Sequence, residues 1–280
     1  MGIGEVGELL RRSTVHIRSF NRRGQSAGSG VIWDGDGIVI TNAHVIGKGS
    51  HSVELWDGRT VVAELKGRDE QRDLAKLKLP DAGVSPISFR ESPVKPGELV
   101  VAVGNPLGFT GALTTGVAHA VGSVPGLGRR QWVQAAIRLA PGNSGGPLAD
   151  AAGRLVGVNT MIVSGIALAI PLSVARDFMT NGAGPRLGVT VQPVRLGRQR
   201  RLGLLVLSVD KGSPAEYASL LIGDLLVGAN ETPFDSPADL ADSIREAGKQ
   251  ALRLRFTRGD HTREREVAIS LLGRATSEAA

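Results

Sequence analysis

Residues 140–148 read APGNSGGPL, in which three glycines and two prolines surround a single serine, Ser144. Glycine, asparagine, serine and proline are the residues that tight turns use in any protein, so the stretch by itself predicts only a turn. A serine flanked by glycines is also a setting in which backbone N–H groups can converge beside a nucleophile. The rest of the chain has to decide between a plain turn and a catalytic serine.

The composition indicates a β protein with many turns. The chain has 280 residues, 41% hydrophobic and 21% charged, which is typical of a globular protein with one large domain or two ordinary ones. Glycine accounts for 38 residues, about twice the usual share, and this favours turn-rich β architecture over helix bundles. The chain has no cysteine, so disulfides and thiol chemistry are excluded.

The charge balance is basic, which brings nucleic acid into consideration as a partner. The net charge is +6, from 33 Lys and Arg against 27 Asp and Glu, and the excess is small and spread over both halves of the chain. Aromatic residues make up only 4%, too few for a surface that stacks single-stranded bases. The densest basic run, RLGRQRR at 195–201, is typical of a solvated loop. Specific nucleic-acid binding is therefore not expected.

Nothing in the sequence predicts a transmembrane segment. No stretch approaches the roughly 18 consecutive apolar residues that a membrane-spanning helix needs. The first residues, MGIGEVGELLRRS, lack the apolar centre of a signal peptide. The chain is expected to be either cytoplasmic or a protein of the cell envelope or periplasm from which a leader has been removed.

Short apolar runs separated by glycine and aspartate turns extend from about residue 14 to 171. No amphipathic helix lies between them, so the pattern predicts an all-β barrel or sandwich and not a parallel α/β sheet. The expected strands cover residues 14–20, 30–33, 37–46, 52–58, 60–69, 74–79, 98–104, 111–122, 131–139, 154–163 and 166–171.

The pattern changes after Pro171. Residues 172–180 have helical spacing, and NGAGP at 181–185 indicates a break. Two helices with start signals follow. One has Ser213 as its N-cap, Pro214 next, and is expected to end before Gly223; the other has Ser236 as its expected N-cap and ends at Gly248. Strands surround these helices and predict a smaller α+β unit; they are expected at 187–194, 203–209, 224–230, 251–256 and 263–270.

Three residues far apart in the chain supply what serine catalysis needs. A serine hydroxyl requires a base, a group that orients the base, and donors for the oxyanion. His44 ends an apolar strand in TNAHVI, Asp73 opens the alternating run RDLAKLKL, and Ser144 follows, which is the order of the chymotrypsin arrangement. Taken singly, each residue has an ordinary structural interpretation, and the other four histidines lack such a context. Only the combination predicts catalysis.

Five motifs in one order carry a resemblance to a known family. TNAHVI (41–46), RDLAKLKL (72–79), AVGNPLGF (102–109), APGNSGGPL and LAIP (168–171) resemble the successive motifs of the HtrA (DegP-like) serine proteases. The resemblance extends from about residue 14 to 270. It implies a mostly β fold, a trypsin-like double six-stranded β-barrel followed by an α+β PDZ domain. The implied domains are a protease domain at 1–180, a linker at 181–185, a PDZ domain at 186–273 and a tail at 274–280.

The resemblance also implies roles for individual residues. His44 is expected to be the general base, Asp73 the group that orients it, and Ser144 the nucleophile. Gly142, Asn143 and Ser144 are expected to form the oxyanion hole. Neither a metal nor an organic cofactor is implied. The implied activity is ATP-independent cleavage of unfolded or damaged proteins by a homotrimer.

The chain departs from the family pattern just before the serine. Ala136 replaces an aspartate and Ala140 an asparagine, and the segment 163–171 is shorter than the usual loop beside the specificity pocket. Arg138 lies where trypsin-like enzymes place the floor of that pocket. It either points inward and favours acidic side chains, or turns away from a small apolar pocket. These departures motivate an alternative function, a chaperone-like peptide-binding scaffold with a resting or inactive protease domain.

The second unit resembles a PDZ domain through RLGV at 186–189. Leu187, Gly188 and Val189 are expected to present backbone amides to the carboxylate of a peptide C-terminus. Leu240 and Ile244 either form the floor of the peptide groove or simply pack the core. The expected partners are peptide C-termini or exposed apolar segments.

Overall fold

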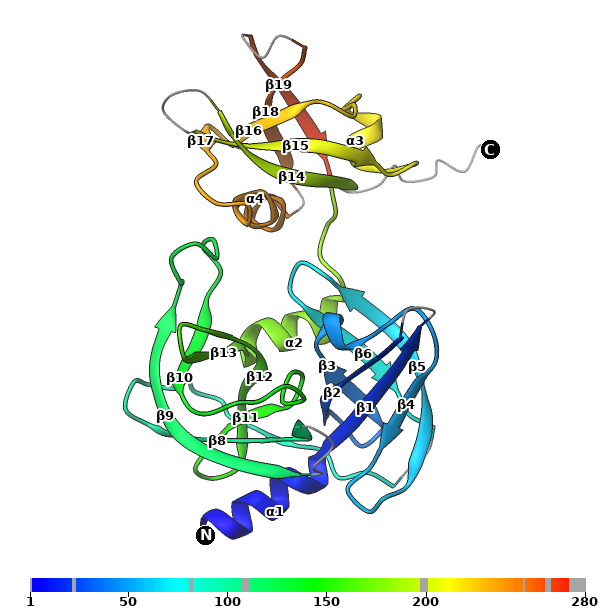
Figure 1. Ribbon diagram of the computed structural model, residues 1–280, viewed down its shortest axis with the longest axis vertical. Coiled ribbons are helices and arrows are strands. Elements are labelled where there is room, and N and C mark those ends of the chain that lie inside the picture. Colours follow the sequence, from blue (N-terminus) through cyan, green and yellow to red (C-terminus); the bar gives the residue numbers. More distant parts are fainter. Residues whose placement is uncertain are drawn as a thin grey trace. The chain divides into compact units, whose positions relative to one another are not determined.

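The computed structural model describes residues 2–21, 24–80, 83–106, 111–196, 201–248, 250–259 and 263–271. The chain divides into two compact units (Figure 1). One comprises Met1–Gly122 with Gln131–Ala183, and the other Ser123–Arg130 with Gly184–Ala280. The tail expected at 274–280 lies outside the described residues.

The first β-barrel is a closed antiparallel sheet in the strand order β1-β2-β3-β6-β5-β4. Apolar side chains alternate along its strands and fill the interior, because successive residues of a strand point to opposite faces; Val15, Ile17, Val39 and Leu77 are among its buried residues. Its strands are β1 (Thr14–Asn21), β2 (Gly24–Ile32), β3 (Ile38–Thr41), β4 (His51–Glu54), β5 (Thr60–Asp69) and β6 (Leu74–Lys78).

The second barrel lies beside the first within the same unit (Figure 1). Its strands follow the order β11-β8-β9-β10-β13-β12, and pairing of β11 with β12 closes the ring. A short strand, β7 (Ser88–Phe89), pairs with β12 in parallel. The barrel strands are β8 (Leu99–Gly104), β9 (Ala112–Gly122), β10 (Trp132–Ala136), β11 (Pro147–Asp150), β12 (Arg154–Val163) and β13 (Ile166–Pro171). The predicted double six-stranded barrel is confirmed.

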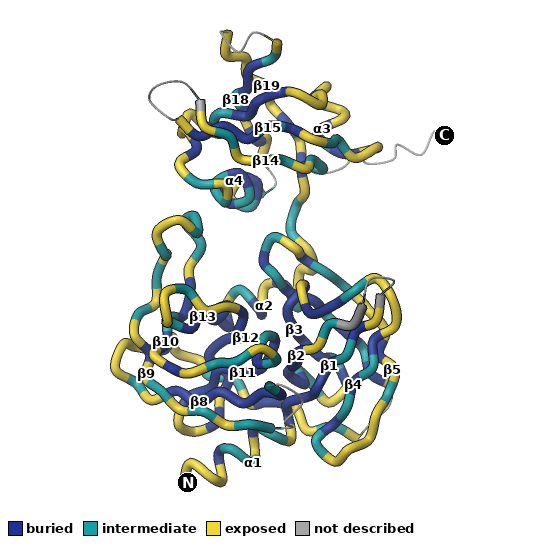
Figure 2. The backbone as a smooth tube through the Cα atoms, in the orientation of Figure 1, coloured by how far each residue is buried: buried dark blue, intermediate teal, exposed yellow. Residues whose placement is uncertain are grey.

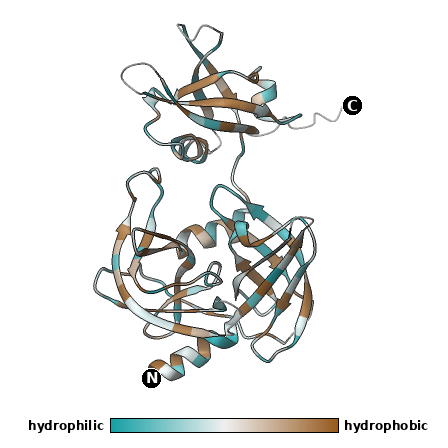
Figure 3. Cartoon of the chain, viewed as in Figure 1, coloured by the Kyte–Doolittle hydropathy of each residue, from teal (hydrophilic) through white to brown (hydrophobic). Residues whose placement is uncertain are grey.

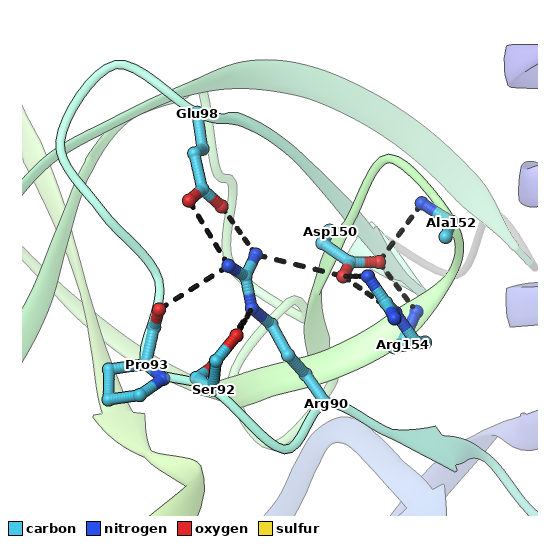
Figure 4. A network of polar contacts seen from close by, with 7 residues as sticks. All are labelled: Arg90, Ser92, Pro93, Glu98, Asp150, Ala152 and Arg154. Atoms are coloured by element: carbon cyan, nitrogen blue, oxygen red, sulfur yellow. Dashed lines mark hydrogen bonds and ion pairs between the residues drawn. The ribbon is translucent and has the colours of Figure 1, made fainter.

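A polar network ties the segment that joins the barrels to the turn between β11 and β12 (Figure 4). The Arg90 guanidinium donates to Glu98 and, at 2.8 Å, to the Ser92 carbonyl, and it lies 3.7 Å from Asp150. Asp150 accepts from the backbone N–H groups of Ala152 and Arg154 at 2.9 and 3.0 Å. Burial alone would raise the pKa of Asp150, but these hydrogen bonds and the Arg154 side chain hold it below its usual value.

Two helices cover the double barrel. α1 (Ile3–Ser13) packs against β1 and β8 through the fully buried Val6 and Leu10, and its two faces differ in hydropathy (Figure 3). This helix was not among the predicted elements. α2 (Leu172–Asn181), which was predicted, contacts β6 of the first barrel and β12 and β13 of the second.

The second unit is a mixed unit of one sheet and two helices, as predicted. The sheet order is β14-β15-β16-β18-β19, with β17 paired to β16. Its elements are β14 (Val189–Leu196), β15 (Arg201–Val209), α3 (Pro214–Tyr217), β16 (Leu225–Ala229), β17 (Thr232–Pro233), α4 (Asp239–Ala247), β18 (Ala251–Thr257) and β19 (Glu264–Ser270).

Both helices of this unit differ from their predicted extent. Ser213 caps α3 as expected by accepting from the Glu216 N–H at 3.2 Å, but the helix ends early because Ser219 adopts a left-handed φ of 58°. α4 begins at Asp239, with Ala238 and not Ser236 as its N-cap. The reason is that the Asp239 carboxylate accepts from the N–H and hydroxyl of Ser236, at 2.9 and 2.8 Å, and holds the preceding segment in a turn.

Candidate active site

His44 and Asp73 are hydrogen-bonded to each other. His44 lies in the single-turn helix η1 (Ala43–Val45) directly after β3, and Asp73 lies in the turn between β5 and β6. His44 Nδ1 is 3.0 and 2.9 Å from the two carboxylate oxygens of Asp73, and the His44 backbone N–H donates to the same carboxylate at 3.0 Å. The bond at Nδ1 leaves Nε2 as the ring nitrogen that can accept a proton.

Asp73 is held in an uncommon backbone conformation. Its φ is 56°, in the left-handed region that aspartate tolerates better than most residues. The buried Asn42 side chain donates to the Asp73 carbonyl at 2.9 Å, and Thr160 Oγ1 donates to Asp73 Oδ2 at 2.6 Å. Asn42 and Thr160 therefore fix the backbone and the carboxylate of Asp73 from two different barrels.

Thr160 also links Asp73 to Ser144. The Ser144 hydroxyl donates to the Thr160 carbonyl at 3.0 Å, and among the described residues this is its one hydrogen bond, so it does not bond to His44. Ser144 is therefore connected to His44 through two other residues: its hydroxyl bonds to Thr160, Thr160 bonds to Asp73, and Asp73 bonds to His44. Thr160 was not among the predicted site residues. The sequence signal for it was that Asn159 and Thr160 interrupt the otherwise apolar residues 155–163 of β12.

The pKa values of His44 and Asp73 both differ from the usual values of these side chains. The hydrogen bond to Asp73 raises the pKa of His44 above its usual value and outweighs the effect of burial. Burial would raise the pKa of Asp73, but the hydrogen bonds from His44 and Thr160 lower it overall. Asp73 therefore remains ionised at neutral pH beside an imidazole that binds a proton more readily.

The turn around Ser144 leaves two amides unused. The N–H groups of Asn143, Gly145 and Gly146 donate to the carbonyls of Ala140, Asn159 and Asn143, at 3.0, 2.8 and 3.0 Å. Gly142 and Ser144 have no hydrogen-bond acceptor for their N–H groups among the described residues. Because the Asn143 amide is used within the turn, Gly142 and Ser144 are the two residues whose amides can serve an oxyanion.

The backbone of Gly142 defines the kind of turn. The bond from the Asn143 N–H to Ala140 closes a four-residue turn with Pro141 second and Gly142 third, and Gly142 has a φ of 107°. A positive φ at the third position belongs to a type II turn, and the residues at both central positions are those it favours. A Cβ at Gly142 would lie 2.5 Å from the Asn105 carbonyl oxygen, so close packing also requires glycine here.

The residues beside the turn are mostly apolar. Ile137 and Leu139 pack into the core of the second barrel, whereas Arg138 is exposed and forms no hydrogen bond or ion pair with the described residues. Met161 and Ile162, which follow Thr160 on β12, are exposed. An exposed apolar strand edge therefore adjoins Ser144.

In the second unit the predicted peptide-binding residues come from two segments: Leu187 and Gly188 precede β14, which begins at Val189, and Leu240 and Ile244 lie on α4. The Leu187 carbonyl accepts from Ala215 and the Gly188 carbonyl from Asp210, both at 2.9 Å, which fixes the loop before β14. Leu240 and Ile244 are buried in the core of this unit. Core packing therefore accounts for these two helix residues, and their contribution to a groove stays a prediction.

The described residues contain no group of three or more His, Cys, Asp or Glu side chains that could hold a metal ion. Within the same residues, no helix combines the length and the apolar character needed to cross a membrane.

Two family models match the chain. Residues 28–158 match the trypsin-like peptidase domain, and residues 205–258 match the PDZ domain. The first match contains His44, Asp73 and Ser144. The second covers α3, β16, β17, α4 and β18 and part of β15, but not β14 or β19.

Several curated proteins are similar over most of this chain. A protein described as a putative serine protease HhoA, from Synechocystis sp., is 34% identical over 91% of this chain and 73% of its own length. A probable periplasmic serine endoprotease, DegP-like, from Hahella chejuensis is 36% identical over 90% of this chain, and one from Rhizobium meliloti is 39% identical over 79%. The chain spans 59% and 48% of the lengths of these two DegP-like relatives.

Solved structures are similar over almost the entire chain. A serine endoprotease from Yersinia pestis superimposes with a TM-score of 0.67 at 26% identity and covers 96% of this chain and 97% of its own. The HtrA-type protease AlgW with a tripeptide gives a TM-score of 0.65 at 26% identity, covering 96% of both chains.

Proposed function

The chain belongs to the HtrA family of trypsin-like serine proteases with a PDZ domain, and on that premise we propose that it is an ATP-independent endopeptidase for unfolded or damaged proteins. The observation that carries the proposal is the ion pair of His44 and Asp73 beside a serine turn with two unused amides. In this proposal Ser144 is the nucleophile, His44 the base and Asp73 the residue that orients it.

The reaction begins with the release of Ser144 from Thr160. The hydroxyl rotates to His44 Nε2, its proton moves to that nitrogen, and Oγ forms a bond to the substrate carbonyl carbon. The N–H groups of Gly142 and Ser144 stabilise the negative charge that develops on the carbonyl oxygen. His44 then gives the proton to the leaving amine as the C–N bond breaks. Water then attacks the acyl carbon while His44 Nε2 takes its proton; the bond to Ser144 Oγ breaks, and His44 returns the proton to Oγ.

The second unit is proposed to bind the C-termini or exposed apolar segments of peptides. Leu187, Gly188 and Val189 would hold the terminal carboxylate through backbone amides, while the peptide extends the sheet beside β14. The structural relative AlgW, whose structure is described with a tripeptide, supports a peptide ligand. By analogy with its DegP-like relatives, the chain is also proposed to act in the cell envelope or periplasm, and the family resemblance favours a homotrimer.

The alternative of a scaffold with an inactive protease domain is less favoured. The substitutions at Ala136 and Ala140 lie outside the hydrogen bonds among Asp73, His44 and Thr160. Nothing in those contacts therefore explains a loss of activity.

Cleavage of β-casein by the wild-type chain and by Ser144→Ala tests the proposal. Loss of the nucleophile is expected to lower the rate by roughly 10⁴-fold or more, because the base and the oxyanion amides then have no attacking atom to assist. A fluorophosphonate probe should label the wild type at Ser144 without an added effector. Casein digestion by the variant at the wild-type rate would refute the assignment, and absence of labelling would favour the scaffold.

A further inference from the structure

One buried serine of the first barrel contacts the serine turn of the second barrel. Ser29 lies on β2 and has 0% of its surface exposed, in the buried stretch 28–32 (dark blue in Figure 2). A buried hydroxyl is costly unless its hydrogen bonds are satisfied. The partners of Ser29 therefore indicate why this position carries a hydroxyl and not an apolar side chain.

The Ser29 hydroxyl uses its full hydrogen-bonding capacity. Oγ accepts from the backbone N–H of Asn105 at 2.9 Å and from Asn105 Nδ2 at 3.2 Å, and it donates to the Gly142 carbonyl at 2.7 Å. A hydroxyl has one proton and two acceptor positions. Because Asn105 occupies both acceptor positions, the single proton is left for Gly142.

The orientation of Asn105 is itself determined by the backbone. Its Nδ2 also donates to the Val15 carbonyl at 3.0 Å, and its Oδ1 accepts from the Gly111 N–H at 3.0 Å. A flipped amide would place oxygen against oxygen at Val15 and nitrogen against nitrogen at Gly111. Asn105 therefore presents a donor to Ser29 and keeps the Ser29 proton directed at the turn.

The Ser29 backbone makes a second connection to the same turn. Its N–H donates to the Ser144 carbonyl at 2.8 Å, while the adjoining Gly145 N–H donates to Asn159. The peptide group between residues 144 and 145 is thus held at both its oxygen and its nitrogen. The group between residues 142 and 143 is held in the same way, by Ser29 at the Gly142 oxygen and by Ala140 at the Asn143 nitrogen.

Close packing leaves the turn little freedom against Ser29. A Cβ at Gly145 would lie 2.1 Å from the Ser29 carbonyl oxygen, and one at Gly146 would lie 3.1 Å from the Ser29 Cβ. The turn therefore rests directly on the backbone of β2, without side chains between them.

We propose that Ser29 is a positioning residue for the reaction, which orients the oxyanion amides of Gly142 and Ser144 by holding the peptide groups beside each of them. The inference rests on the proposed protease function and adds to it a residue of the first barrel that positions the oxyanion amides of the second. Asn105 acts through Ser29, because it fixes the direction of the hydroxyl proton. Neither side chain touches the reacting atoms.

The test measures kcat and KM for a peptide substrate in Ser29→Ala and Asn105→Asp. The first variant removes the proton donated to Gly142; the second offers the Ser29 proton a carboxylate in place of Gly142. In both, kcat is expected to fall by roughly 10- to 100-fold with little change in KM, because a misplaced oxyanion donor affects the transition state and not substrate binding. Binding of a peptide boronate, which places an oxygen in the oxyanion site, should weaken in parallel, whereas binding of a product peptide should not.

Ser19→Ala is the matched control. Ser19 is equally buried, on β1 of the same barrel, and its hydroxyl accepts from the Gly47 N–H and bonds to His51, with no contact to the turn. It should lose thermal stability but keep kcat. An unchanged kcat in Asn105→Asp, or a loss in Ser29→Ala no larger than in Ser19→Ala, would overturn the inference while wild-type cleavage upholds the proposed function. If the wild type does not cleave at all, both proposals fail.

Discussion

At the scale of single residues, the candidate site depends on side chains that act on one another's backbone. Asp73 keeps a left-handed φ that costs of the order of 1–3 kcal/mol for a residue other than glycine. Hydrogen bonds from Asn42 to its carbonyl and from Thr160 to its carboxylate hold it there. The strained backbone places the carboxylate where it can accept from both the ring and the backbone N–H of His44.

Only part of this site could be predicted from the sequence. His44, Asp73 and Ser144 stand in short motifs with recognisable spacing, so they could be named, and their catalytic roles stay predictions. Thr160 could not be named, because its importance comes from contacts to residues 87 and 16 positions away. The hydrogen bond from the Asn143 N–H to Ala140 within the turn could not be read from the sequence either.

The raised pKa of His44 predicts the pH dependence of cleavage. A general base must be unprotonated, so kcat/KM should fall as the pH drops through the His44 pKa. Since the bond to Asp73 raises that pKa, the midpoint of this fall is expected above the ordinary histidine value of about 6.5. Asp73→Asn should move the midpoint to lower pH and reduce kcat by roughly 10⁴-fold.

The measurement is the pH profile of kcat/KM for a short peptide substrate, between pH 5 and 9 or so. His119 lies outside the motifs that contain the predicted site residues, so it provides the control, and His119→Gln should leave the profile in place. A midpoint that does not move in Asp73→Asn would mean that another group controls the acidic limb.

At the scale of elements, α1 shows how a short helix can be stabilised almost entirely by packing. An isolated helix of 11 residues is marginal in water, but Val6 and Leu10 lie one turn apart and are fully buried against the barrels. Arg11 and Arg12 also lie about 5 Å from the ring of Trp56. These contacts attach the start of the chain to both barrels.

Two of the elements that were not predicted, α1 and β11, have no clear pattern of their own in the sequence. The first residues of the chain include three glycines, which weaken any local helix signal, so the burial of α1 could not be anticipated. β11 follows the serine turn directly and consists of four residues that are buried between β8 and β12, so it was included in the turn. Most of the longer strands have patterns of their own and were predicted, whereas β2 was expected only from residue 30.

Replacing Leu10 tests the contribution of α1. Leu10→Ala is expected to lower the free energy of unfolding of the first unit by about 2–5 kcal/mol, because it leaves a cavity in a fully buried site. Leu9→Ala is the control, since Leu9 is 49% exposed on the same helix and its loss should change stability by less than about 0.5 kcal/mol. Urea unfolding followed by tryptophan fluorescence measures both. Equal effects in the two variants would show that α1 does not contribute through its buried face.

At the scale of the whole molecule, the chain combines two units with different proposed tasks, hydrolysis and peptide binding. The family resemblance predicted both from motif order, and the fold confirms the double barrel and the PDZ-like unit. One part of the division into units has no signal in the sequence: Ser123–Arg130, which lies between β9 and β10 in the chain, belongs to the second unit.

If the two tasks are separate, a change in the peptide-binding loop should leave hydrolysis of short substrates intact. Gly188 has a φ of 80°, and a Cβ there would lie 2.2 Å from the Cβ of Ser213, so Gly188→Ala must displace the loop before β14. Gly212→Ala is the matched control, because Gly212 has a similar φ of 73° but open space around it. Fluorescence anisotropy with a labelled peptide that ends in apolar residues, measured in a Ser144→Ala background, should show affinity reduced by about tenfold or more in the first variant and retained in the second. Equal peptide affinities in Gly188→Ala and Gly212→Ala would place the peptide site elsewhere. If Gly188→Ala, made in a chain that retains Ser144, abolished cleavage of short peptides and Gly212→Ala did not, the two units would work as one.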